Sequence, residues 1–215
     1  AEDVIVLAFE ACRRFDRESL TALLHGEAAV LGLPRFLRER VVPLLDEVGA
    51  SWDRGEIEIR HEHFFSEVLE DELRRLRAPL EPATKGRPVV IASLPNELHG
   101  LGLQIAALAI VTAGRSVRVL GPHLPVEEIT QAAKTLDASA VGLSVSVFAE
   151  PEETAREISA VRERLSAETA LWIGGAGSAN LENLPAGVEK AVSLDDLDRM
   201  LSRLPAEVPA TSPNP

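Results

Sequence analysis

The sequence predicts a four-helix bundle followed by a doubly wound, Rossmann-like α/β domain with a parallel sheet. Apolar residues recur at spacings of three and four throughout residues 1–78 and never alternate strictly with polar ones, which indicates helices. Beyond residue 88, short apolar runs rich in β-branched residues alternate with helical stretches, the order typical of a parallel sheet. The segment between them, residues 79–88, is rich in Pro and lacks periodicity, so we predict a linker there.

Three breaks divide the helical region into about four helices of ordinary length. They fall near Asp16, at residues 32–34 (Gly-Leu-Pro) and at residues 52–55 (Trp-Asp-Arg-Gly). Connections of this length join neighbouring helices in bundles. We therefore expect residues 1–78 to form a small bundle that is a domain of its own.

The second domain, residues 89–204, contains four apolar runs typical of buried parallel strands. They span residues 89–94, 117–121, 140–146 and 170–175. Helical stretches lie between them, at about residues 100–113, 126–136 and 151–166. An edge strand at residues 187–192 and a last helix at residues 194–203 complete the prediction. Residues 205–215 contain four prolines, and we predict a disordered tail there.

The composition excludes several classes of protein. Acidic residues outnumber basic ones 34 to 22, and the resulting charge of −12 repels the phosphates of nucleic acids. Cys12 is the one cysteine in the sequence, which excludes an internal disulfide and a Cys-rich metal site and is typical of a cytoplasmic protein. No apolar run has the length of a membrane span, and no signal-peptide pattern opens the sequence. We expect a cytoplasmic protein with no membrane contact.

The first loop of the α/β domain carries a pattern suited to metal or substrate binding. Ligands of such sheets bind at the carboxyl ends of the strands, and Glu97, His99 and Gly102 follow the first predicted strand. A histidine placed in this way can present one ring nitrogen to a metal or substrate while the nearby carboxylate accepts a hydrogen bond from the other. A helix cap or an exposed loop residue is the alternative interpretation of His99.

Small residues mark the other loops at the same edge. In the second loop, Gly121 and Pro122 let the backbone pass close to a bound group, although a turn without a ligand explains them almost as well. Small side chains at the ends of the third and fourth strands would leave a slot beside the core, or would allow tight packing of helix on sheet. These residues are Ser144, Val145, Ser146, Gly174, Gly175 and Gly177. Neither GxGxxG nor a Walker lysine pattern is present, so a nucleotide site is weakly supported.

Taken together, Glu-x-His-x-x-Gly, Ser-Val-Ser and Gly-Gly resemble the cobalamin-binding domain of the methionine synthase type, which corrinoid methyltransferase proteins and several mutases share. The resemblance covers about residues 87–205. It implies that His99 is the lower axial ligand of cobalt and that Glu97 is its hydrogen-bond partner. It also implies a slot for the displaced nucleotide tail of the cofactor. The residues lining that slot would be Gly102, Ser144, Ser146, Gly174 and Gly175.

The helical region carries a second motif, Trp52 followed after nine residues by Glu62 and His63. This pattern resembles the Trp-x9-Glu-His signature of CarH-type light-sensing regulators of the MerR family. The resemblance implies that the bundle covers the upper face of adenosylcobalamin, with Trp52 against the adenosyl group and the other two residues nearby. Without the downstream motif, Trp52 would be interpreted as a bundle-core aromatic, and the Glu-His pair as part of an exposed helix face.

The sequence departs from this family at two places. Asp53 stands where the best-known members have a His that can ligate cobalt after light has cleaved the cobalt–carbon bond. We expect either His61 or His63 to take that role, or water to remain the upper ligand. No basic helix-turn-helix pattern precedes the bundle, and the first residue is Ala. The chain is therefore expected to be the sensory part of a longer regulator or a standalone sensor.

The resemblance implies a cobalamin-binding, light-sensing module of a transcriptional regulator, without catalytic residues and not an enzyme. Photolysis of adenosylcobalamin would change its conformation and separate a homo-oligomer that assembles in the dark. DNA binding would need a missing N-terminal domain. Two alternatives remain open, a corrinoid shuttle protein of a methyltransferase system and a standalone antirepressor that binds cobalamin or haem.

Overall fold

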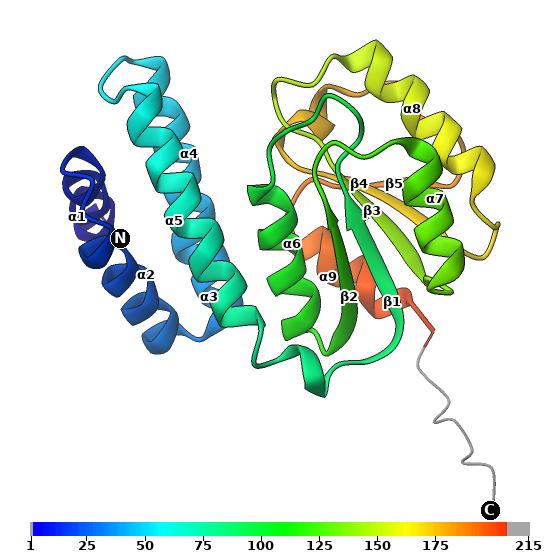
Figure 1. Cartoon of the computed structure of the whole chain (residues 1–215), viewed down its shortest axis with the longest axis horizontal. Helices are drawn as coiled ribbons and strands as arrows, with labels where there is room; N and C mark the ends of the chain where they lie inside the picture. The colour runs from blue at the N-terminus through cyan, green and yellow to red at the C-terminus, as the bar shows by residue number, and fades with distance from the viewer. Residues whose placement is uncertain (1, 206–215) are drawn as a thin grey trace, which may run out of the picture.

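The computed structural model describes residues 2–205, and Figure 1 shows their arrangement. The helical region contains α1 (Glu2–Arg13), α2 (Arg17–Leu31), α3 (Leu33–Phe36), a π-helical turn (Leu37–Val41), α4 (Val42–Asp53) and α5 (Ile59–Arg77). Because α3, the π-helical turn and α4 follow one another without a gap, they form one continuous helix. With α1, α2 and α5, this helix makes up the predicted four-helix bundle. The predicted tail lies outside the described residues except for Pro205.

The helices end at the three predicted breaks for identifiable reasons. Asp16 caps α2, since its carboxylate accepts a hydrogen bond from the backbone N–H of Ser19 at 3.0 Å. Gly32 and Gly55 have φ of +74° and +71°, a conformation that favours glycine and ends a helix. Pro43 explains the π-helical turn before it, because proline lacks an N–H and its ring crowds the carbonyl four residues back.

The second region is a five-stranded parallel sheet with helices on both faces, as predicted. Its elements are the short helix η2 (Glu81–Ala83), β1 (Lys85–Ala92), α6 (Leu101–Thr112), β2 (Arg115–Gly121), α7 (Val126–Thr135), β3 (Ala140–Ser144), α8 (Pro151–Arg164), β4 (Ala170–Gly174), η3 (Ala176–Asn180), β5 (Val188–Ala191) and α9 (Leu194–Arg203). The strand order is β2-β1-β3-β4-β5. Because β1 begins at Lys85, residues 85–88 of the predicted linker continue the first strand.

The two faces of the sheet belong to two separate hydrophobic clusters. On β1, Val89 and Ile91 point into the cluster that contains α6 and α9, whereas Val90 and Ala92 point into the cluster beneath α7 and α8. This alternation follows from the period of two along a strand. The cluster on the α6 side continues into the bundle without interruption, so the bundle and the sheet share one core.

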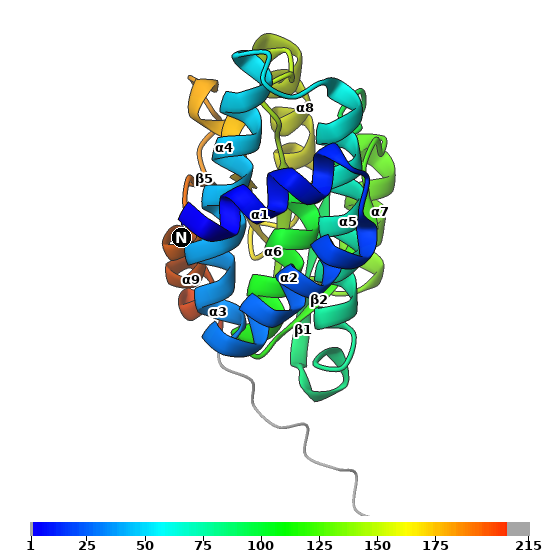
Figure 2. The ribbon, with the colours of Figure 1, turned by 90° about the vertical axis from the view of Figure 1, so that its left-hand side faces the viewer.

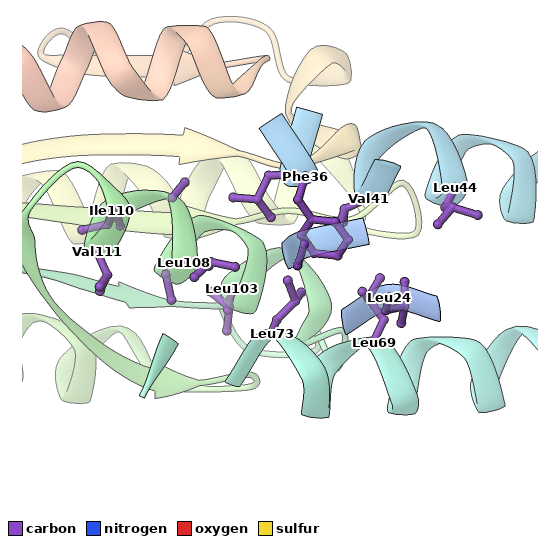
Figure 3. Close-up of a cluster of buried hydrophobic side chains, with 14 of the residues drawn as sticks. Leu24, Phe36, Val41, Leu44, Leu69, Leu73, Leu103, Leu108, Ile110 and Val111 are labelled. Atoms are coloured by element: carbon purple, nitrogen blue, oxygen red, sulfur yellow. The ribbon is translucent and has the colours of Figure 1, made fainter. Parts of the chain in front are cut away.

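Helix α6 is the layer that makes this shared core. Its sequence, LGLQIAALAIVT, is apolar around the whole helix, as expected for a helix covered on every side. It packs against β1 and β2 on one side and against α5 and α3 of the bundle on the other. In Figure 3, Leu103 and Leu108 of α6 lie beside Leu73 of α5 and Phe36 of α3. Figure 2, seen from the bundle side, shows α1 and α2 in front of these layers.

Polar contacts add to this packing. Arg77 of α5 donates a hydrogen bond to the side-chain oxygen of Gln104 on α6 at 2.8 Å. Arg38, in the π-helical turn, forms ion pairs with Asp195, at 2.9 Å, and with Asp198, both on α9. The bundle is thereby held against the α/β domain at two separate helices.

We predict that Leu73→Ala destabilises both regions together by ~2–5 kcal/mol, because the substitution leaves a cavity in their shared core. Urea unfolding followed by circular dichroism and by tryptophan fluorescence should shift as one transition, since Trp52 reports on the bundle and Trp172 on the sheet. Leu7→Ala, on the exposed side of α1, is the control and should leave the midpoint almost unchanged. Separate transitions of the two regions would contradict a shared core.

Candidate functional site

The candidate residues gather at the carboxyl edge of the sheet. Since β1, β3 and β4 are parallel neighbours, the loops that follow them emerge at the same edge. The turn between α4 and α5 lies at this end of the molecule as well, at the top of Figure 1. Residues of the bundle and of the α/β domain therefore meet at one place.

Glu97 and His99 form the centre of this edge. The carboxylate of Glu97 accepts hydrogen bonds from His99 Nδ1 at 2.6 Å and from the His99 backbone N–H at 3.0 Å. Its other oxygen accepts from the backbone N–H of Ser146 at 2.8 Å. Glu97 is 6% exposed, whereas the side chain of His99 is 53% exposed. Because Nδ1 is engaged by the carboxylate, Nε2 is the nitrogen of His99 that is available to a ligand.

The surroundings of Glu97 keep its carboxyl group ionised. Burial, the largest single influence, raises its pKa, but the hydrogen bonds from Ser146 and His99 together outweigh burial, and the pKa lies below its ordinary value. An ionised Glu97 acts only as an acceptor, so it requires a hydrogen on His99 Nδ1. The pair therefore presents an oriented Nε2 with a free lone pair at the edge of the sheet.

An aromatic contact joins the bundle to this pair. Phe148, in the loop after β3, stacks on the ring of His99 with centroids 5.3 Å apart and planes inclined by 26°. Trp52, at the end of α4, meets Phe148 edge-on at 6.3 Å. Trp52 is 40% exposed and Phe148 is 65% exposed, high values for large apolar side chains. Phe148 is not among the residues predicted from the sequence, although an aromatic side chain two residues beyond Ser-Val-Ser is a usable signal.

The other predicted bundle residues make contacts of their own. His61 is 8% exposed, stacks on Phe15 at 5.2 Å and accepts a hydrogen bond at Nδ1 from the backbone N–H of Glu58. It is therefore engaged in capping and packing α5. His63 is exposed and pairs with Glu62, whose carboxylate also accepts from Ser66 at 2.7 Å. Asp53 is the last residue of α4.

The predicted small residues lie in close contact with one another. A side chain on Gly175 or Gly177 would collide with the backbone of residues 145 and 146, and one on Gly102 would collide with Ser144 Oγ. Gly174 differs, because its nearest neighbours belong to Ala191 of β5. Segment 144–146 thus occupies the space that these glycines leave free. The structure agrees with the alternative of tight packing, and a group entering the slot would have to move this segment.

The loop after β2 contains a glycine at positive φ and is hydrogen-bonded to the loop after β1. Gly121 has a φ of +109°, which a residue with a side chain rarely adopts. Its carbonyl accepts from the backbone N–H of Ser93 at 3.1 Å, and the Ser93 carbonyl accepts from Leu124 at 3.0 Å. Pro122, the other predicted residue of this loop, is exposed.

Comparisons with known proteins agree with this geometry. Two family models match the chain, both described as B12 binding domain, one over residues 8–77 and the other over residues 87–189. B12 is cobalamin, and the matches cover the bundle and most of the α/β domain. The chain is a cobalamin-binding protein.

Among its relatives, this cobalamin-binding protein is 29% identical over 168 residues to the HTH-type transcriptional repressor CarH of Myxococcus xanthus. That match covers 78% of the chain and 56% of the relative, so the chain spans little more than half of the repressor. It is 23% identical to dimethylamine corrinoid protein 2 of Methanosarcina mazei, over 74% of the chain and 77% of the relative.

A solved structure confirms the fold. The monomethylamine corrinoid protein of Methanosarcina barkeri superposes with a TM-score of 0.69 over 93% of the chain and 97% of that protein, at 15% identity.

None of the helices in residues 2–205 is both long enough and apolar enough to cross a membrane.

The donor set of this cobalamin-binding protein suits cobalt held in a corrin ring. Within the described part of the chain, no three His, Cys, Asp or Glu side chains gather closely enough to hold a bare metal ion. A single imidazole can complete the coordination of a metal that arrives with its other ligands already bound, as cobalt does in a corrin. His99 Nε2, backed by the ionised Glu97, has the chemistry required for that bond.

We predict that Glu97→Gln weakens the binding of hydroxocobalamin by roughly 10- to 100-fold, because the neutral amide no longer holds the ring of His99 through a charge-assisted hydrogen bond. The affinity is measured by titrating the apoprotein and recording the visible absorbance of the cofactor. Glu128→Gln, an exposed glutamate on α7, is the matched control and should bind as the parent does. Equal affinities of parent and Glu97→Gln would refute the assigned role of Glu97.

Proposed function

We propose that this chain is the cobalamin-binding, light-sensing module of a transcriptional regulator and not a catalyst. The observation that carries the proposal is the contact of Trp52 with Phe148, which brings an aromatic residue of the bundle to the side of the α/β domain where His99 lies. The relationship to the repressor CarH over 78% of the chain supports the regulatory role. The bound cofactor, adenosylcobalamin in this proposal, supplies a cobalt–carbon bond that light can break.

In this proposal the α/β domain holds the cofactor from below. His99 Nε2 ligates cobalt, and Glu97 keeps the proton on Nδ1. The nucleotide tail requires the space beside Gly102 and Gly175. In this structure segment 144–146 fills that space, with Ser144 against Gly102 and Val145 against Gly175. Since the backbone N–H of Ser146 donates to Glu97, displacement of this segment also acts on the partner of the cobalt ligand. Occupation of the slot and orientation of His99 are thereby coupled.

The bundle covers the upper face. Trp52 provides an apolar surface for the adenosyl group, and Phe148 moves aside so that the corrin can lie between Trp52 and His99. Glu62 and His63, one turn into α5, provide polar groups beside this surface. Of the two histidines considered as upper ligand after photolysis, His63 is the stronger candidate, because its ring is exposed while that of His61 is packed on Phe15.

Without the adenosyl group, Trp52 would lose the surface that it contacts in this proposal, and a different position of the bundle would be favoured. A cofactor shifts such an equilibrium only through its different affinity for the two states. In this proposal, the position of the bundle decides whether copies of the chain assemble in the dark. A longer regulator would supply the DNA-binding domain.

A corrinoid shuttle of a methyltransferase system is the second candidate. The dimethylamine corrinoid relative and the fold of the monomethylamine corrinoid protein favour it. A shuttle must expose the upper face of its cobalt to a methyl donor and acceptor, and Trp52 would obstruct that exchange. The identity of the preferred upper ligand therefore separates the two functions.

We predict that green light changes both the visible spectrum and the elution volume of the protein loaded with adenosylcobalamin in darkness. The spectrum changes because the cobalt–carbon bond breaks, and the elution volume changes because the oligomer separates. The same protein loaded with hydroxocobalamin is the control and should show neither change. A constant elution volume on illumination would contradict light sensing, whereas cobalamin binding would stand.

We predict further that Trp52→Ala reduces the affinity for adenosylcobalamin more than the affinity for methylcobalamin. The extra loss should be roughly 5- to 30-fold, because truncating an aromatic contact costs about 1–2 kcal/mol. The comparison of two cofactors in one variant cancels general damage to the bundle. In a corrinoid shuttle both affinities would change equally.

His99→Ala tests the lower ligand separately, since an unchanged cobalt spectrum would exclude His99 from coordination.

A further inference from the structure

The loop that carries Glu97 and His99 is tied to the neighbouring loop by one residue, His123. The two loops follow the paired strands β1 and β2 and remain hydrogen-bonded beyond the end of the strands. The backbone N–H of His123 donates to the carbonyl of Glu97 at 3.0 Å. Its imidazole Nδ1 accepts from the backbone N–H of Asn96 at 2.9 Å.

The second of these bonds defines the state of the ring. A backbone N–H can only donate, so Nδ1 of His123 must carry a free lone pair and the ring hydrogen is on Nε2. His123 therefore binds as a neutral acceptor. The side chain of His123 thus pairs with the backbone N–H of Asn96, and its main chain pairs with the backbone carbonyl of Glu97.

The backbone at this place adopts a left-handed conformation at two facing residues. Asn96 has a φ of +67° and His123 a φ of +57°, a region that is uncommon for residues other than glycine, although Asn and His tolerate it better than most. Contacts between the loops stabilise this conformation over the commoner ones. The two hydrogen bonds made by His123 are contacts of this kind, and they act directly before the buried carboxylate of Glu97.

From this arrangement we infer that His123 is a positioning residue for the cobalt ligand. The restraint passes from the imidazole of His123 to the backbone of Asn96 and Glu97, and from the Glu97 carboxylate to the ring of His99. The inference rests on the proposed binding of cobalamin through His99. His123 itself touches neither metal nor cofactor in this scheme and acts only through the loop.

Two substitutions isolate the imidazole acceptor. His123→Gly adopts the positive φ freely and keeps the backbone N–H, so it removes the acceptor at Nδ1 without adding strain. His123→Asn also tolerates this conformation and places its Oδ1 at the position along the side chain that Nδ1 occupies in histidine. The asparagine variant should therefore restore what the glycine variant loses.

The first measurement uses the protein without cofactor. Hydrogen exchange of the Asn96 amide, followed by nuclear magnetic resonance, should be about fivefold faster in His123→Gly than in the parent and nearly normal in His123→Asn. The second measurement is the affinity for hydroxocobalamin. We expect it to fall roughly 2- to 10-fold in His123→Gly and to recover in His123→Asn, as the loss of one hydrogen bond implies.

The cobalt signature completes the test. In the Co(II) form, electron paramagnetic resonance detects an axial nitrogen, and His123→Gly should show a mixture of nitrogen-bound and nitrogen-free signals. The inference fails if His123→Gly matches the parent in affinity and signal, or if His123→Asn is as impaired as His123→Gly. If His99→Ala keeps the full nitrogen signal, the proposed ligation itself fails, so the two failures are distinguishable.

Discussion

Helix α6 is buried on both sides, and this burial dictates how the bundle and the sheet are arranged. A helix that is apolar around its whole circumference cannot lie on the surface, so it requires a second layer beyond the sheet. The bundle provides that layer through α5 and α3. Because α6 also begins directly after the loop of His99, the packing that stabilises the protein places the turn after Trp52 at the same end as His99.

Glu97 affects both the stability of the fold and the orientation of His99. It is a buried carboxylate, which costs free energy unless hydrogen bonds compensate for the loss of water. These bonds come from His99 and from Ser146, and they connect the loops after β1 and β3. A cofactor that displaces segment 144–146 would alter this carboxylate and, through it, the imidazole. One buried charge therefore connects the position of segment 144–146 with the orientation of His99.

The chain is similar in sequence to a transcriptional repressor and to corrinoid proteins, and it shares the fold of a corrinoid protein, so the fold alone does not select the function. The difference must lie in what covers the upper face of the cofactor. In the proposed function the covering residue is Trp52, which in this structure contacts Phe148; both are exposed aromatic side chains and not part of the bundle core. Their exposure is a cost to solubility and to the apoprotein, and cofactor binding gives a physical reason for it.

The order of helices and strands, the three helix breaks and the Glu97–His99 pair can be predicted from local sequence, because periodicity, caps and a spacing of two residues are local properties. Contacts between distant residues become visible only in the folded chain. The stacking of Phe148 on His99, the contact of His123 with Asn96 and the packing of segment 144–146 on Gly175 and Gly177 all join loops far apart in sequence. These contacts depend on the strand order, which brings β1 between β2 and β3, and no local pattern specifies that order.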